Sequence, residues 1–146
     1  MASFTDYAEN KFVDWLFRGQ VLTPPATFYF ALVTAVGNDA TAGTEVSGGS
    51  YARVAIAGSL ANWAGTQSAG STVASSGTNG TTSNNGVITF PTPSAAWGVI
   101  VGVELWDAAT AGNRWAWSPA FAGKTVNSTD PAPTFAAAAL TFQVDN

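Results

Sequence analysis

The stretch Trp97-Gly-Val-Ile-Val-Gly-Val-Glu-Leu-Trp106 decides the fold class, together with the run Arg114–Phe121 that follows it. One face of the first run carries Trp97, Val99, Val101, Val103 and Leu105, and the other carries Gly98, Ile100, Gly102, Glu104 and Trp106. This period of two is typical of a β-strand with an apolar face. The small residues of Asp107–Asn113 separate the two runs, so the sequence predicts a β-hairpin.

Strand patterns continue on both sides of this hairpin. Thr27–Ala35 is apolar on both faces, which is typical of a strand that is covered on both sides. Further strands are predicted at Tyr51–Ala57, Val87–Phe90 and Ala136–Val144. Seven or eight short strands predict a mainly β fold, an antiparallel β-sandwich of the jelly-roll kind over residues 26–144, in one domain spanning 1–146.

One α-helix precedes the strands, over residues 3–19. Ser3 or Thr5 can cap its first turn, and Gly19 can end it. Apolar residues cover more than half of the helix circumference. Two interpretations stay open: the helix lies over a sheet, or part of its apolar stripe docks on another subunit.

The segment Ala64–Gly86 has an unusual composition. Of its 23 residues, 18 are Gly, Ser, Thr or Asn, and none is charged. A structureless loop of this length is uncommon inside a compact domain. The segment is therefore either a mobile loop, because it cannot offset its ordering entropy by burial, or an arm ordered by a partner.

The composition argues against most catalytic chemistry. The 146 residues include no His, no Cys and only 5 Lys+Arg. Without His or Cys there is no Ser-His-Asp triad, zinc-thiolate site or iron–sulfur cluster, and five basic residues cannot form a nucleic-acid footprint. No apolar run is long enough to span a membrane, and Met1–Asp6 lacks the basic start of a signal peptide. We therefore expect no enzyme, cofactor, metal site, nucleic-acid or membrane partner, or small-molecule substrate.

The acidic residues of the hairpin give two further expectations. Glu104 and Asp107 are three positions apart and are expected to face water rather than form a glycosidase pair. Asp107 and Asn113 could contribute to a surface calcium site, but a turn held by Asx hydrogen bonds is the favoured interpretation.

Low charge indicates a surface that a partner covers. Only 10% of the residues are charged, and residues 54–103 carry no charge at all. Such a chain is poorly suited to staying soluble as a free monomer, because charged surfaces resist association. Its six tryptophans could pack in the core, anchor protein contacts or stack on sugars. The candidate partner contacts are Phe12, Trp15, Leu16, Phe17, Trp63, Val73 and Trp106.

Five stretches of the sequence resemble small virion proteins of tailed bacteriophages. They are Phe4–Lys11, Asp14–Gln20, Pro24–Thr34, Gly43–Arg53 and Gly80–Pro91. Members of this group are often labelled tail-fibre-like, and some resemble the cement or decoration proteins that sit on the outer capsid as small β-sandwich oligomers. Such proteins usually have a small residue and an aliphatic residue before the hairpin Asp, where this chain has Glu104-Leu-Trp-Asp107.

The resemblance implies a structural role in the virion. The favoured hypothesis is a capsid cement protein, made in the host cytoplasm, that lies on the outer capsid surface and stabilises the assembled head. Its expected partners are the major capsid protein and neighbouring copies of itself, as a dimer or trimer. A tail-fibre or baseplate component is the first alternative, and a carbohydrate-binding module is the second.

Overall fold

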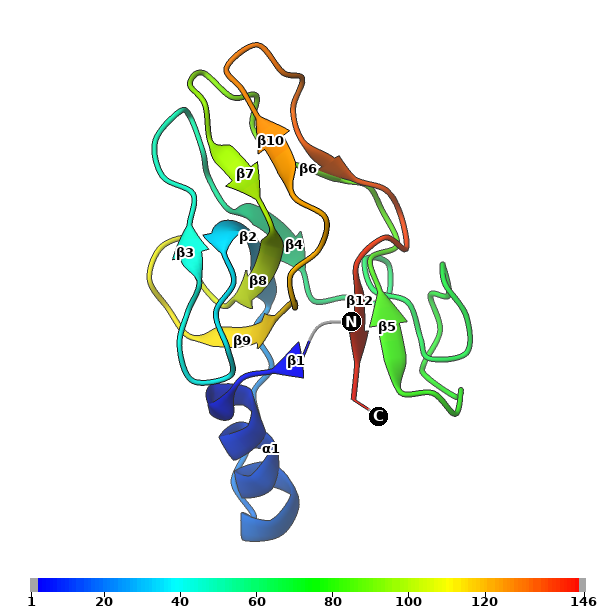
Figure 1. The fold of residues 1–146 in the computed structure, drawn as a ribbon. Coiled ribbons are helices and arrows are strands. Elements are labelled where there is room, and N and C mark those ends of the chain that lie inside the picture. Colours follow the sequence, from blue (N-terminus) through cyan, green and yellow to red (C-terminus); the bar gives the residue numbers. More distant parts are fainter. Residues whose placement is uncertain (1–2, 145–146) are drawn as a thin grey trace.

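The computed structural model describes residues 3–144, which form one helix and twelve short strands (Figure 1). The helix is α1 (Asp6–Arg18). The strands are β1 (Ser3–Phe4), β2 (Thr27–Ala35), β3 (Thr44–Glu45), β4 (Val54–Ala57), β5 (Thr81–Ser83), β6 (Ile88–Thr89), β7 (Gly98–Ile100), β8 (Gly102–Trp106), β9 (Arg114–Trp117), β10 (Lys124–Val126), β11 (Thr134–Phe135) and β12 (Thr141–Gln143). The predicted mainly β fold with antiparallel sheets and one N-terminal helix is confirmed, whereas the sandwich or jelly-roll arrangement is not.

A six-stranded antiparallel sheet forms the body of the molecule. Its order is β1-β9-β8-β2-β3, and β4 pairs with the first half of β2 on the same edge as β3. β2 has the bounds predicted for it, and Phe30–Val33 are buried whichever face they lie on. The prediction of a strand covered on both faces is therefore confirmed.

The predicted hairpin is present as β8 and β9, but the long strand predicted over residues 97–106 is two strands. β7 pairs with β10, while β8 pairs with β2 and β9. Gly98 has a φ of +87°, and the chain changes sheet at Val101. This change shifts the alternation, so that Ile100 is buried and Val99 is exposed. Val99 therefore does not share the buried face of Trp97, Val103 and Leu105, with which the alternation groups it.

Three two-stranded antiparallel ribbons, β10–β7, β11–β6 and β12–β5, complete the fold (Figure 1). β5 lies inside the segment 64–86 that the sequence predicts as a loop or arm. Next to it, Asn84 is 2% exposed and donates from Nδ2 to the carbonyls of Gly86 and Ala136. Its Oδ1 accepts from the N–H of Leu140. One buried amide thus joins this polar segment to the chain before β12.

The core is aromatic and draws on the central sheet and all three ribbons. Phe30 of β2 stacks on Trp63 with ring centroids 5.9 Å apart, and Trp63 meets the edge of Phe142 at 5.7 Å. The other buried core side chains include Leu32, Ile88, Phe90, Trp97, Ile100, Val103, Leu105 and Val126. Burial of such large rings is the main stabilising contribution to a fold whose strands are this short.

α1 is anchored at its first turn and projects from the body (Figure 1). Thr5 caps it by accepting from the N–H of Ala8, and Gly19 ends it with a φ of +67°. The predicted helical start at Ser3 is wrong, because Ser3 and Phe4 pair with β9 instead. Ala8 is the one buried residue of the helix, so α1 does not lie over the sheet. With 13 residues, this sole helix of the described part of the chain is too short to cross a membrane.

Candidate interaction surface

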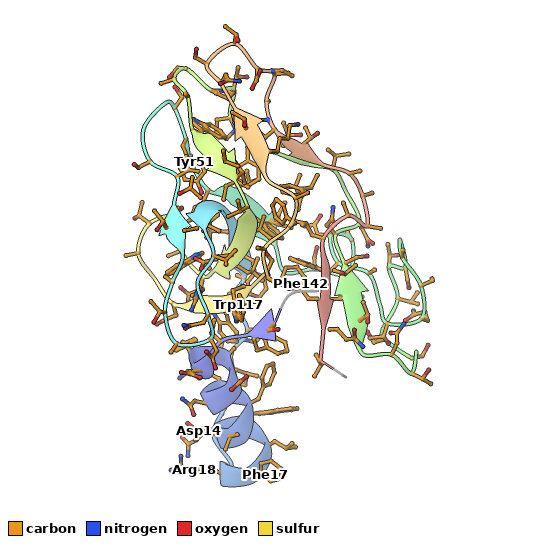
Figure 2. All side chains as sticks on the ribbon, in the orientation of Figure 1. Asp14, Phe17, Arg18, Tyr51, Trp117 and Phe142 are labelled. Carbon is orange, nitrogen blue, oxygen red and sulfur yellow. The ribbon has the colours of Figure 1, made fainter. Side chains whose placement is uncertain are left out.

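The far half of α1 and the turn after it expose large apolar side chains. The exposed fractions are 53% for Trp15, 62% for Leu16, 77% for Phe17 and 90% for Val21. Figure 2 shows Phe17 at the free end of the helix, close to Asp14 and Arg18. Helices of this length gain most of their stability from packing an apolar face, and here that face is bare within the chain.

Three charged residues of α1, Lys11, Asp14 and Arg18, lie along one stripe of the helix, whereas Asp6 and Glu9 of its first turn lie on the side of Val13. Arg18 binds Asp14 at 2.6 Å, one turn away, and the ammonium of Lys11 lies 5.5 Å from the ring centre of Tyr7. Positions 7, 11, 14 and 18 follow helical spacing along one side. The far half of the helix therefore keeps its ion pair on one side and its exposed apolar residues Val13, Leu16 and Phe17 on the other.

An apolar hollow of about 310 Å³ lies at the root of α1. Six aromatic side chains contribute to its walls: Phe4, Phe12, Phe28, Trp63, Trp115 and Phe142. Among its lining residues Thr82 carries the one hydroxyl group, and that group donates to the carbonyl of Ala64. Water in the hollow would find few hydrogen-bond partners, so the hollow suits an apolar group.

The seven predicted contact residues lie in different places. The hollow brings Phe12 and Trp63 together, and α1 carries Trp15, Leu16 and Phe17 outward from it. The other two predicted residues are Val73 and Trp106. Val73 is exposed in the loop between Trp63 and β5, whereas Trp106 is half-buried beneath the guanidinium of Arg53, 4.2 Å from its ring centre.

Sequence reasoning missed most of the walls of the hollow. Phe4, Trp115 and Phe142 come from the two ends of the chain and from β9, and the sheet topology alone brings them together. Pro24 and Pro25 also line the hollow, which no pattern in the sequence indicated.

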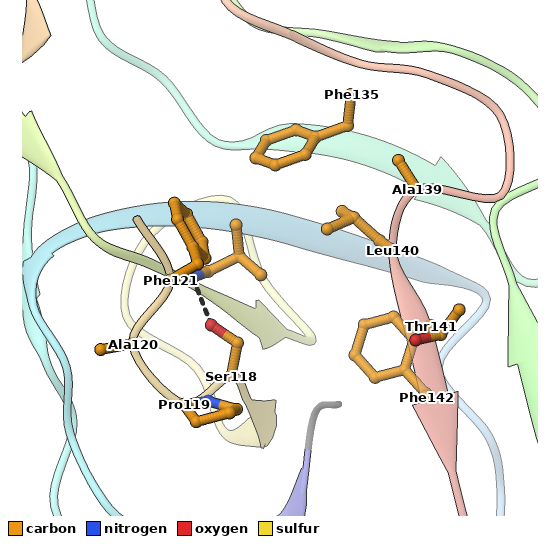
Figure 3. A pocket seen from close by; sticks show the side chains of 10 residues that line it. Ser118, Pro119, Ala120, Phe121, Phe135, Ala139, Leu140, Thr141 and Phe142 are labelled. Carbon is orange, nitrogen blue, oxygen red and sulfur yellow. Dashed lines mark hydrogen bonds between the residues drawn. The ribbon is translucent and has the colours of Figure 1, made fainter. Parts of the chain in front are cut away.

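A second hollow, of about 330 Å³, lies between the segment after β9 and β12 (Figure 3). Phe121, Phe135 and Leu140 contribute apolar walls. The hydroxyl of Ser118 accepts from the N–H of Val103 at 2.9 Å, which is the bond drawn in Figure 3. This bond uses one acceptor position of the hydroxyl, whose O–H remains available as a donor.

Glu104 does not face water, and that prediction is wrong. It is 2% exposed, and its Oε1 accepts from Arg114 Nη1 and from the N–H of Gly43, both at 2.7 Å. Arg114 also donates to the carbonyls of Asn38 and Asp39. The reason is that the adjacent strand supplies a counter-charge, so the carboxylate can be buried in the sheet.

A second ion pair fixes the edge of the sheet. Arg53 donates to both carboxylate oxygens of Glu45, at 2.7 and 2.9 Å, and to two carbonyls of the 107–113 turn. The hydroxyl of Tyr51 donates to Glu45 and accepts from the buried N–H of Leu32. Burial raises the pKa of Tyr51 well above its usual value. These residues belong to one of the stretches that carry the virion resemblance, and here they serve the fold.

Asp107 organises the hairpin turn. Its carboxylate accepts from the N–H of Asn113 at 2.7 Å, from the side-chain amide of Asn113 at 2.9 Å and from Trp115 Nε1 at 3.3 Å. Partial burial alone would raise the pKa of Asp107, but these hydrogen bonds together lower it. The favoured interpretation, a turn held by hydrogen bonds of Asp107 and Asn113, is thus confirmed. Within residues 3–144 no three His, Cys, Asp or Glu side chains gather as a metal site would require.

Comparison with known proteins places the chain among phage proteins. The model of the family described as Podophage GP4 fiber I protein gp80 matches residues 3–143. The chain belongs to this gp80 family. No curated protein matches the sequence. The gp80 match spans α1, the hollow and every strand, so the protein is a bacteriophage structural protein and a component of the virion. The predicted resemblance to phage virion proteins is confirmed at this level.

Proposed function

We propose that the protein is a small structural component of the phage fibre apparatus. The observation that carries the proposal is the match of residues 3–143 to a family described as a podophage fibre protein. The structure supports a structural role, because the carboxylates of Glu45, Glu104 and Asp107 are engaged in ion pairs and turn hydrogen bonds. The exposed apolar side of α1 provides a surface for attachment to another virion chain.

A capsid cement protein that binds the major capsid protein on the outer head is the second candidate. The same exposed helix favours it, since an apolar element that is covered only in the assembled shell would stabilise that shell by linkage.

The carbohydrate-binding hypothesis has weaker support. Of the six tryptophans only Trp15 is more than half exposed, and it lies on the helix rather than on a sheet face.

Fractionation of purified virions tests the location. Particles are dissociated mildly into heads and tail or fibre complexes, and the protein is quantified in each fraction by mass spectrometry and by antibody gold labelling. The fibre proposal predicts recovery with the tail or fibre fraction. Recovery with intact heads, in numbers comparable to the major capsid protein, would refute it and favour the cement hypothesis.

A further inference from the structure

We propose that α1 pairs with α1 of a second copy of this chain, so that Leu16 and Phe17 of each copy reach the apolar hollow at the helix root of the other. The proposal names the partner of the surface described above and rests on the proposed structural role. It does not depend on whether the protein lies on the fibre or the head.

One chain carries both halves of such a contact. The projecting tip of α1 is apolar, and the hollow at its root is walled mainly by apolar groups. Because the same copy has the projecting tip and the hollow, two copies can exchange them around a twofold axis, and each contact is made twice.

The geometry of the helix fits an antiparallel pair. At 1.5 Å per residue, α1 is about 20 Å long, and residues 12 and 17 lie only about 7–8 Å apart along its axis. Two antiparallel helices that cross near residue 14 place residues 16 and 17 of one beside residue 12 of the other. Phe12 is the helical residue that lines the hollow. The tip of one helix therefore lies at the level of the hollow of its partner.

Asp6 and Glu9 share the Val13 side of the helix but lie in its first turn, about 8–12 Å along the axis from the crossing at residue 14, which keeps them at the edge of the contact. Val13, Leu16 and Phe17 follow the i, i+3, i+4 spacing of a helix–helix seam. Asp14 and Arg18 are paired within one helix and stay 34% and 70% exposed. The seam is apolar while the rim is charged, which is the usual anatomy of a protein interface.

The exposed area approaches what a stable dimer needs. With aromatic side chains of roughly 150–250 Å² and smaller aliphatic ones, the exposed parts of Val13, Trp15, Leu16, Phe17 and Val21 come to about 600 Å² per copy. A standard interface buries about 800 Å² per partner. The walls of the hollow add further apolar area to this contact.

Sedimentation equilibrium of the purified full-length protein tests the proposal, over about 1–100 μM. We expect twice the mass of a single chain in this range. The variant L16E/F17E should dimerise at least about 100-fold more weakly, because two carboxylates would have to enter the apolar hollow. The matched control is V73E, which adds a charge at an exposed valine of the loop and should leave the dimer intact. Circular dichroism checks that both variants stay folded.

Disulfide trapping gives a second measurement, because the chain has no Cys of its own. Under mild oxidation, an F12C chain mixed with an L16C chain should form the mixed disulfide, whereas L16C mixed with V73C should not. A wild-type monomer at every concentration, or a dimer that L16E/F17E leaves unchanged, would overturn the pairing. If the wild-type protein is a monomer and is recovered with fibres, only the pairing is overturned. If it is a dimer and is recovered with heads, only the proposed location is refuted. If the wild type is a monomer and the L16E/F17E variant fails to enter virions, the pairing is overturned and the partner of this surface is another virion protein.

Discussion

Replacing Glu104 by Ala would leave a buried guanidinium without its counter-charge. The side chain of Arg114 is 6% exposed, and its Nη1 lies 2.7 Å from Glu104 Oε1. Removal of one partner from a buried ion pair costs about 3–5 kcal/mol. A domain of this kind has a total free energy of unfolding of about 5–15 kcal/mol, so Glu104→Ala should remove a large share of it.

The double variant Glu104→Met/Arg114→Met separates the cost of a broken pair from the value of the pair itself. Replacing both charges by apolar side chains is often close to neutral. The N–H of Gly43 also loses its acceptor, which adds about 1–3 kcal/mol. The double variant should therefore be more stable than Glu104→Ala, even though it carries more substitutions.

Urea unfolding followed by tryptophan fluorescence, at one fixed protein concentration, measures these differences. Glu9→Ala on the exposed side of α1 is the control and should stay within about 0.5 kcal/mol of the wild type. The reasoning is refuted if Glu104→Ala costs less than about 1 kcal/mol. It is equally refuted if the double variant is less stable than Glu104→Ala.

Three further substitutions test other contacts. Tyr51→Phe should cost about 1–3 kcal/mol near neutral pH, because a buried N–H loses its acceptor. The pKa of Tyr51 is raised above 10.0 in the folded state, so the wild type should lose stability as the pH rises past that value. Urea titrations at these pH values compare the free energies of unfolding of the wild type and Tyr51→Phe. A difference between the two that stays constant with pH would contradict this prediction. Asn84→Ala removes three hydrogen bonds and should cost about 2–4 kcal/mol, visible as a lower Tm; an unchanged Tm would show that the amide is dispensable. Gly43→Ala would push a Cβ into the carbonyl of Ala35 and should cost at least about 2 kcal/mol in urea unfolding. The control Gly86→Ala places its Cβ in open space and should cost little. Equal losses of stability in the two variants would contradict this account of the packing.

Local sequence rules predicted what depends on neighbouring residues. Thr5 as helix cap and Gly19 as helix stop follow from residue types suited to those positions, and the Asp14–Arg18 pair likewise joins residues only four positions apart. The bounds of β2 follow from its own apolar composition, because each of its residues is suited to a covered strand. These features needed no knowledge of the rest of the chain.

Features that depend on pairing between distant segments could not be predicted in the same way. Glu104 appears polar in isolation, and only the register of β8 and β9 brings Arg114 to it. A signal was present, since an acid within one apolar strand and an arginine at the start of the next indicate a cross-strand pair. Asn84 had no such signal, because its partners include Ala136 and Leu140, more than fifty positions away.

The candidate interaction surface was predicted in part. The helical residues Trp15, Leu16 and Phe17 are recognisable from their periodicity, but the periodicity alone did not show that α1 projects instead of covering the sheet. Its direction depends on the pairing of β1 with β9, which holds the first turn. The hollow is assembled from both ends of the chain and is invisible to any local pattern.

The change of sheet at Val101 has a mechanical consequence. β7 and β8 are separated by this one residue, so only a one-residue linker connects the β10–β7 ribbon to the central strand β8. Tension applied to the ribbon would pass directly to β8, which is hydrogen-bonded along both edges, to β2 and β9. Several hydrogen bonds would then have to break together rather than one after another. The molecule is thus built so that a pull on its outer ribbon is resisted by the centre of its sheet.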